Sequence, residues 1–254
     1  MRERIKRYDW KRKLRGLCAI GTGVLMMTLT GMMIDGCGKS AEREKWIREA
    51  LREKYGEEFE VMHVYGQGVL EDYYTAEAYA AAYPDLPFSL NVDVKDNTFM
   101  DGYVMKRGTN LISSRAQKNL GRLKNPYYVH TQSMFPDSVS TDPDQSLEQY
   151  LDAEKTNFFT VYLYIDPEGE TAESIYRSVR DLPAGMERMQ GSLEIFFADE
   201  KTMGRAQEYV ESHAALEEEY ARIGRGCHVT GIRLGDGVLD ISEEGFLSRI
   251  RAQM

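Results

Sequence analysis

A basic segment followed by an apolar run opens the sequence, and this order constrains the chain more than any other feature. Residues 1–16 hold eight Lys or Arg against Glu3 and Asp9, a net charge of +6. Such a charge holds a segment on the cytoplasmic side of a membrane. Residues 17–34 have no charged side chain and are mostly apolar. We expect this run to enter the membrane, so that the chain after it lies outside the cytoplasm.

The last residue of the apolar run and the three residues after it resemble a lipobox, the processing motif of bacterial lipoproteins. Ile34 stands three residues before Cys37, and the small Gly36 directly precedes the cysteine. In that family the matching cysteine receives a diacylglyceryl group and becomes the mature N-terminus. The resemblance therefore assigns lipidation to Cys37, with Ile34, Asp35 and Gly36 as the cleavage context. Asp35 departs from the pattern, which usually has a small or hydroxylated residue there.

The same apolar run also fits an uncleaved anchor. Its eighteen residues, at ~1.5 Å each in a helix, approach the ~30 Å hydrocarbon core of a bilayer. Anchoring by lipid and anchoring by an N-terminal helix both predict a location at the outer face of the cytoplasmic membrane.

Residues 38–254 form a cysteine-poor, acidic chain. Cys227 is their single thiol, so no disulfide can form within them. The whole chain carries −9, and removing the +6 segment and Asp35 leaves −14 on these residues. An acidic surface repels phosphate backbones, so we expect no nucleic-acid partner.

Hydrophobic periodicity predicts short strands and helices along residues 38–254. Strands are expected over 59–65, 72–82, 88–94, 127–134, 158–165, 193–197, 228–234 and 238–241. Helices are expected over 40–55, 99–120, 147–155, 172–182, 202–223 and 243–251. Asp236-Gly237 between two apolar runs indicates a hairpin turn. The pattern predicts an α+β fold, with mainly antiparallel sheets and helices packed on one face, after an N-terminal signal or transmembrane helix.

A segment rich in Pro, Ser and Asp suggests a boundary within this fold. It covers residues 135–144. We therefore expect three parts: a lipoprotein signal peptide or membrane anchor over 1–37, an N-terminal α+β domain over 38–136, and a C-terminal α+β domain over 146–254.

Two motifs near the start of the 38–136 region carry a further resemblance. They are the helix end Lys54-Tyr55-Gly56-Glu57-Glu58-Phe59-Glu60-Val61 and the turn Pro84-Asp85-Leu86 before a strand. Both are similar to uncharacterised exported lipoproteins of Gram-positive bacteria. The resemblance implies an extracytoplasmic α+β protein and no particular reaction.

The nucleophiles and metal ligands form no recognisable catalytic set. His63 and His130 fall in expected strands and are interpreted as half-buried imidazoles, whereas His213 continues the apolar stripe of a helix and is expected at the core edge. No two histidines have the spacing of a helical metal pair. Cys227 and His228 are neighbours on an expected strand, where consecutive side chains point to opposite faces. We therefore predict no catalytic residue, no metal site and no cofactor.

Tyrosines gather at three places, at 73–74, at 127–128, and at 162 with 164. Sheet packing and a recognition surface both explain such clusters. The sequence predicts a membrane-anchored, non-enzymatic binding or accessory component of the cell envelope, with another envelope protein as its partner. The first alternative is a cell-envelope hydrolase that uses dispersed carboxylates or Cys227, and the second is a solute-binding lipoprotein.

Overall fold

The computed structural model describes residues 40–65, 73–134, 138, 140–213 and 228–254. The chain separates into two units, residues 1–50 and 51–254. A helix covers residues 40–55, as the sequence predicts. In the first unit, the Ser40 hydroxyl donates to Glu44 at 3.2 Å. No helix among the described residues is long and apolar enough to cross a membrane, and the apolar run lies outside them.

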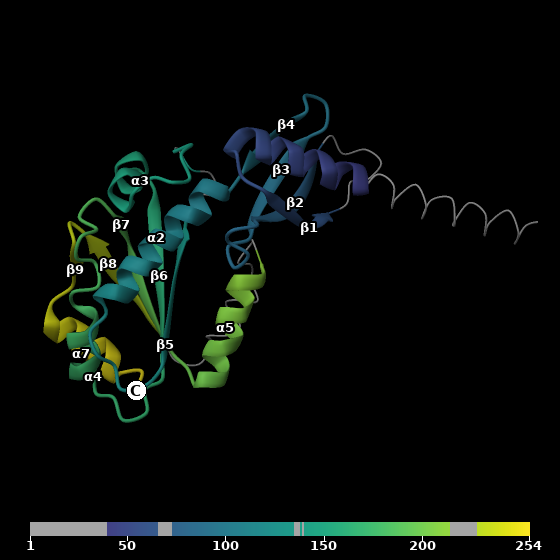
Figure 1. The fold of residues 1–254 in the computed structure, drawn as a ribbon. Coiled ribbons are helices and arrows are strands. Elements are labelled where there is room, and N and C mark those ends of the chain that lie inside the picture. Colours follow the sequence, from purple (N-terminus) through teal and green to yellow (C-terminus); the bar gives the residue numbers. More distant parts are fainter. Residues whose placement is uncertain (1–39, 66–72, 135–137, 139, 214–227) are drawn as a thin grey trace, which may run out of the picture. The chain divides into compact units, whose positions relative to one another are not determined.

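Sheet A is an antiparallel meander of four strands, in the order β1-β2-β3-β4 (Figure 1). The strands are β1 (Phe59–Tyr65), β2 (Tyr73–Ala80), β3 (Phe88–Asp93) and β4 (Thr98–Asp101). The strands expected at 59–65, 72–82 and 88–94 are confirmed. The alternating pattern of apolar residues explains these strands, since every second side chain is buried along β2 and β3.

The helix expected over 99–120 begins later than predicted. Its first residues form β4, and α2 (Tyr103–Asn119) follows after Gly102. Asn97, with φ of 50°, makes the turn that returns the chain beside β3. The Gly102 N–H then donates to the Ser89 carbonyl at 3.0 Å, which holds the strand end in the sheet. Pairing with β3 thus turns these residues into a strand, although the sequence pattern is helical. Gly102 weakens that helical pattern.

The first residue of α2 belongs to the core of sheet A. Tyr103 is fully buried, and its ring lies 5.0 Å from Phe59 and 5.2 Å from Phe88. The contact with Phe59 is edge-to-face, the arrangement that aromatic quadrupoles favour. The Tyr103 hydroxyl donates to Glu57 at 2.8 Å.

Sheet B has five strands in the order β5-β6-β7-β8-β9. They are β5 (Tyr127–Ser133), β6 (Phe158–Ile165), β7 (Gln190–Phe197), β8 (His228–Gly235) and β9 (Val238–Asp240). Only β6 and β7 pair in parallel, and α4 (Ala172–Val179) makes the crossover between them. Asp236 and Gly237, with φ of 51° and 73°, form the expected hairpin turn. The two sheets and their helices confirm the α+β class.

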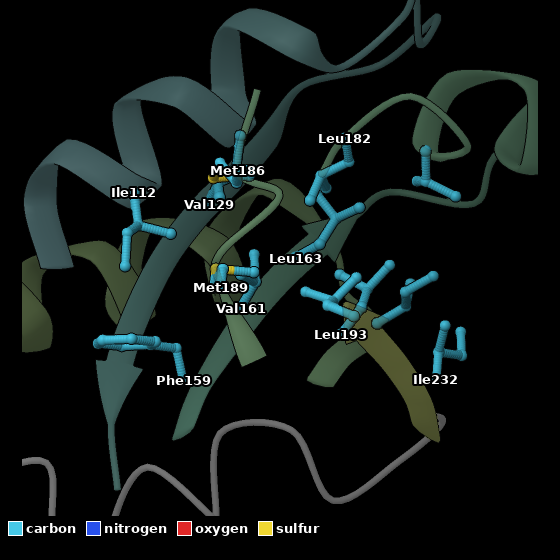
Figure 2. Packing of buried hydrophobic residues seen from close by; sticks show 14 of the residues in the cluster. Ile112, Val129, Phe159, Val161, Leu163, Leu182, Met186, Met189, Leu193 and Ile232 are labelled. Atoms are coloured by element: carbon cyan, nitrogen blue, oxygen red, sulfur yellow. The ribbon is translucent and has the colours of Figure 1, made fainter. Parts of the chain in front are cut away.

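Helices cover both faces of sheet B. The larger core lies between one face and α2, α3 (Leu147–Ala153), α4 and α7 (Glu243–Arg251), and Figure 2 shows its closely packed Val161, Leu163 and Leu193. Helix α5 (Glu200–Ser212) lies on the other face (Figure 1). Its Met203 and Ala206 pack in one cluster with Tyr164 and Phe196. The helix expected over 202–223 is described only as α5, since residues 214–227 lie outside the described residues.

Sheet B draws strands from both of the expected domains. Strand β5 precedes the expected linker and β6 follows it, yet the two pair along their full length. The buried Glu154 holds the described part of the linker, because it accepts from Ser138 Oγ at 2.5 Å and from the Ser140 N–H at 3.1 Å. The segment is therefore tied to the end of α3 by hydrogen bonds.

Candidate functional site

The outer face of sheet A carries exposed tyrosine and methionine side chains. Tyr65, Thr75, Asn91 and Met100 stand opposite one another on the four strands, and Tyr73 lies two residues before Thr75 on β2. We call these five residues the tyrosine face. Tyr65 is 48% exposed, Tyr73 60% and Met100 59%.

Side chains of this kind are suited to recognition. Tyrosine offers a large contact area and a polar tip at low entropic cost, and methionine adapts its shape to a partner. Between them, the Thr75 hydroxyl donates to Asn91 Oδ1 at 2.9 Å. The tyrosine face therefore combines exposed anchors with hydrogen-bonding groups between them.

Tyr83 is exposed as well but is not part of this face. The Arg107 guanidinium lies 3.8 Å from the centre of its ring, a cation–π contact. Arg107 Nη1 also donates to the Tyr103 hydroxyl at 2.9 Å. Tyr83 is thus engaged in fastening α2 to the loop between β2 and β3.

An ionisable cluster adjoins the tyrosine face and shares Tyr65 with it. It consists of Tyr65, Glu77, Lys106, His130 and Tyr162. The buried Glu77 on β2 accepts a hydrogen bond of 2.9 Å from the Tyr65 hydroxyl. The His130 ring on β5 stacks on Tyr162, with centroids 4.8 Å apart and planes 7° from parallel. Lys106, on the first half of α2, is partly buried.

Burial perturbs both basic groups of the cluster. It lowers the pKa of Lys106 to about 8, although the nearby Glu77 charge acts in the opposite direction. Burial, and then the Lys106 charge, lowers the pKa of His130 to about 3, so this imidazole is neutral at pH 7. Within the described part of the chain, the Lys106 amine makes no hydrogen bond and no ion pair.

The structure places some of the sequence-predicted residues and not others. Five lie outside the described residues: Ile34, Asp35, Gly36, Cys37 and Cys227. His130 is buried. His63 is exposed, and His213 is exposed at the end of α5, so the expectations of a half-buried and a core-edge imidazole are wrong for these two. For His228 the structure gives the backbone alone, paired with Phe196.

The tyrosine clusters divide between packing and exposure. Tyr164 is buried and stacks on Phe196 at 5.0 Å, and Tyr128 lies 6.0 Å from Tyr164. These rings pack within sheet B. Tyr73, by contrast, is exposed on sheet A. Of the two explanations for the tyrosine clusters, a recognition surface is therefore the one that suits Tyr73.

Two cavities lie away from this region. One, of about 490 Å³, sits where β6 and β7 end and is lined by Asp166, Glu168 and Asp199 with Phe197. Asp199 accepts from the Thr202 N–H at 2.7 Å and thereby caps α5. The other, of about 340 Å³, lies between α3 and residues 185–188. Over the described residues, no group of three or more His, Cys, Asp or Glu could hold a metal ion.

Sequence reasoning missed Glu77 and Lys106. The available signal was weak, since Glu77 is the single charged residue within a strand of Ala, Tyr and Thr, and Lys106 looks like an ordinary helix residue. Only the tertiary arrangement of β2, α2 and β5 brings them together with His130.

Comparisons with known proteins support the fold. The sequence matches no family model and no curated protein. The structure is similar to the crystal structure of a DUF5037 family protein from Ruminococcus gnavus, with a TM-score of 0.59 and 19% sequence identity. The match covers 82% of this chain and 98% of that one. At this identity the similarity shows a shared fold.

Proposed function

We propose that this protein is a membrane-anchored lipoprotein at the outer face of the cytoplasmic membrane, where it binds another envelope protein through the tyrosine face. The observation that carries the binding role is the exposure of Tyr65, Tyr73 and Met100 together on one face of sheet A. The basic and apolar segments before Cys37 support the location.

The charge of the chain narrows the chemistry of the partner. Residues 38–254 carry −14, so a partner with a positively charged surface is attracted over a distance. Exposed aromatic side chains then supply the short-range contacts, because a few such anchors dominate the energy of most interfaces. The expected partner therefore has basic residues around pockets that accept tyrosine rings.

Crosslinking in intact cells, followed by purification of the full-length protein, tests this role. We expect one partner to be recovered, and Tyr73→Ala and Met100→Ala to reduce its yield. Loss of an anchor of ~2 kcal/mol weakens binding by about thirtyfold.

Met134 provides a matched control. It is 68% exposed, more than Met100, and lies at the end of β5, outside the tyrosine face. Met134→Ala should leave the yield unchanged. Equal yields from all variants would contradict the proposal, and cleavage of peptidoglycan by the full-length protein would replace it with the hydrolase alternative.

A further inference from the structure

The parallel strands β6 and β7 end side by side, and the chain leaves them toward opposite faces of sheet B. The Ala198 N–H donates to the Ile165 carbonyl at 3.0 Å, which holds the two strand ends together. After β6 the chain enters α4, which packs in the larger core on one face. After β7 it enters α5 on the other face (Figure 1). Neighbouring parallel strands that diverge in this way leave a crevice at their carboxyl ends, and ligands of such sheets bind at this switch point.

The cavity of about 490 Å³ lies at this switch point. One wall is the turn after β6, with Asp166 and Glu168, and the other is the end of β7 with the turn after it, which supply Phe197 and Asp199. Small-molecule sites typically measure ~300–1,000 Å³. The strand order and the cavity, two independent features, therefore indicate the same place for a ligand.

The charge of the walls favours a cation. Asp166, Glu168 and Asp199 line the cavity, and none of them forms an ion pair with a described residue. Other switch points hold phosphate at a helix N-terminus. Here Asp199 takes that place itself, because its side chain accepts the Thr202 N–H at 2.7 Å and caps α5. An anion would thus meet like charges on both walls.

The turn after β6 holds its carboxylate through the backbone. Asp166 Oδ1 accepts the Glu168 N–H at 3.0 Å, and Gly169 takes a φ of 72° that suits glycine. The Lys124 amine donates to the Gly169 carbonyl and so is engaged by the backbone of this turn. A carboxylate can accept roughly four hydrogen bonds, so Asp166 retains acceptor capacity for a ligand.

The placement of the carboxylates distinguishes among cations. Over the described residues, no three His, Cys, Asp or Glu side chains could hold a metal ion, so the cavity carboxylates do not converge on one point. A ligand with one ammonium group would neutralise one charge of three. A linear polyamine carries several ammonium groups separated by methylene chains, and Pro167, Phe197 and Met254 offer apolar surface for those chains.

We propose that this cavity binds a linear polyamine, with its ammonium groups on Asp166, Glu168 and Asp199 and its methylene chain along Phe197. The charge of −14 on residues 38–254 attracts such a cation from a distance. The site belongs to sheet B, whereas the tyrosine face belongs to sheet A, so this role goes beyond the protein docking proposed above.

Isothermal titration calorimetry of the full-length protein in detergent micelles tests the proposal. The probe is spermidine, and butylamine and calcium chloride are the comparisons. We expect one spermidine per chain, bound more tightly than either comparison. Asp166→Asn and Asp199→Asn should each weaken spermidine binding by about tenfold or more, the usual effect of losing a charge-assisted contact. Asparagine keeps an acceptor for the turn and caps a helix as well as aspartate, so both variants should fold.

Glu208→Gln is the matched control, since Glu208 is exposed on α5 and does not line the cavity. It should leave spermidine binding unchanged. Equal losses in Glu208→Gln and Asp166→Asn would indicate attraction to the acidic surface as a whole and would overturn the proposal. No binding heat with spermidine, or binding of butylamine or calcium as tight as that of spermidine, would overturn it as well. Tyr73→Ala should leave spermidine binding intact, which separates this result from that of the docking experiment.

Discussion

The ring of Tyr150 occupies the space in which a side chain at Gly108 would begin. A Cβ atom at position 108 would lie 2.1 Å from Tyr150 Cζ. Tyr150 is fully buried on α3, so its ring has no free space to enter. Helices α2 and α3 therefore approach each other closely only because residue 108 is glycine.

Gly108→Ala should destabilise the protein by about 2–3 kcal/mol, because overpacking a rigid site forces rotamers and backbone to shift. Gly204→Ala is the matched control, since Gly204 is also helical, on α5, and has nothing within 4 Å of a Cβ. The Gly204→Ala variant should gain about 0.5–1 kcal/mol in its free energy of unfolding, because alanine has the higher helix propensity. Chemical unfolding of both variants measures the difference, and equal effects would contradict the packing described.

Tyr150→Phe should stabilise the protein by about 1 kcal/mol. The Tyr150 hydroxyl is buried and has no hydrogen-bond partner among the described residues, so its removal relieves an uncompensated desolvation. Tyr103→Phe is the contrasting variant, because the Tyr103 hydroxyl bonds both Glu57 and Arg107. Tyr103→Phe should lower the free energy of unfolding by about 1–2 kcal/mol, because these hydrogen bonds are lost. Denaturation midpoints that fall for Tyr150→Phe would show that its hydroxyl has a partner.

Stability should decrease as the pH falls from about 6.5 toward 3. The pKa of His130 is 6.5 in an unfolded chain and about 3 in the fold, so in this window the unfolded chain binds a proton that the folded one does not. Linkage then predicts that His130 lowers the free energy of unfolding by about 2.5 kcal/mol between pH 7 and pH 4.5.

His130→Phe keeps a ring for stacking on Tyr162 and removes the proton-binding group. Urea unfolding at the two pH values should show a smaller loss for this variant than for the wild type. His213→Gln, at an exposed position, should retain the wild-type loss. An identical pH dependence in His130→Phe would refute the assignment to His130.

The N-terminal sequence predicts that the mature protein begins at lipidated Cys37. Mass spectrometry of the membrane fraction should find an acylated Cys37 at the N-terminus, and Cys37→Ala should abolish lipid labelling. Asp35→Ser should speed processing, since it restores a hydroxylated residue at that position. Recovery of an intact segment from Met1 onward without acyl mass would instead support the uncleaved anchor.

Much of the fold follows from local patterns in the sequence. Alternating Phe88, Leu90 and Val92 give β3, and Asp236-Gly237 gives the hairpin of β8 and β9. Strand β4 was missed because four residues carry too little periodicity and its place depends on pairing with β3.

The candidate site was less predictable than the fold. Tyr73 and Tyr164 both belong to tyrosine clusters that sheet packing or recognition could explain, and nothing local distinguishes the exposed Tyr73 from the buried Tyr164. Burial lowers the pKa of Lys106 on α2, and Glu77 on β2 acts in the opposite direction, so both causes are tertiary effects. Charge and burial that depend on distant segments leave no mark in the neighbouring residues.

The order of strands in sheet A has a consequence for how the chain assembles. Each strand pairs with the next one in sequence, so the ladder is complete once Asp101 is available. Contacts between near neighbours form fast because they close short loops. Tyr103, two residues after Asp101, then packs against Phe59 and completes the aromatic core. Sheet A can thus reach its native pairing before β6 has been synthesised, whereas sheet B requires strands from both sides of the residue 135–144 segment.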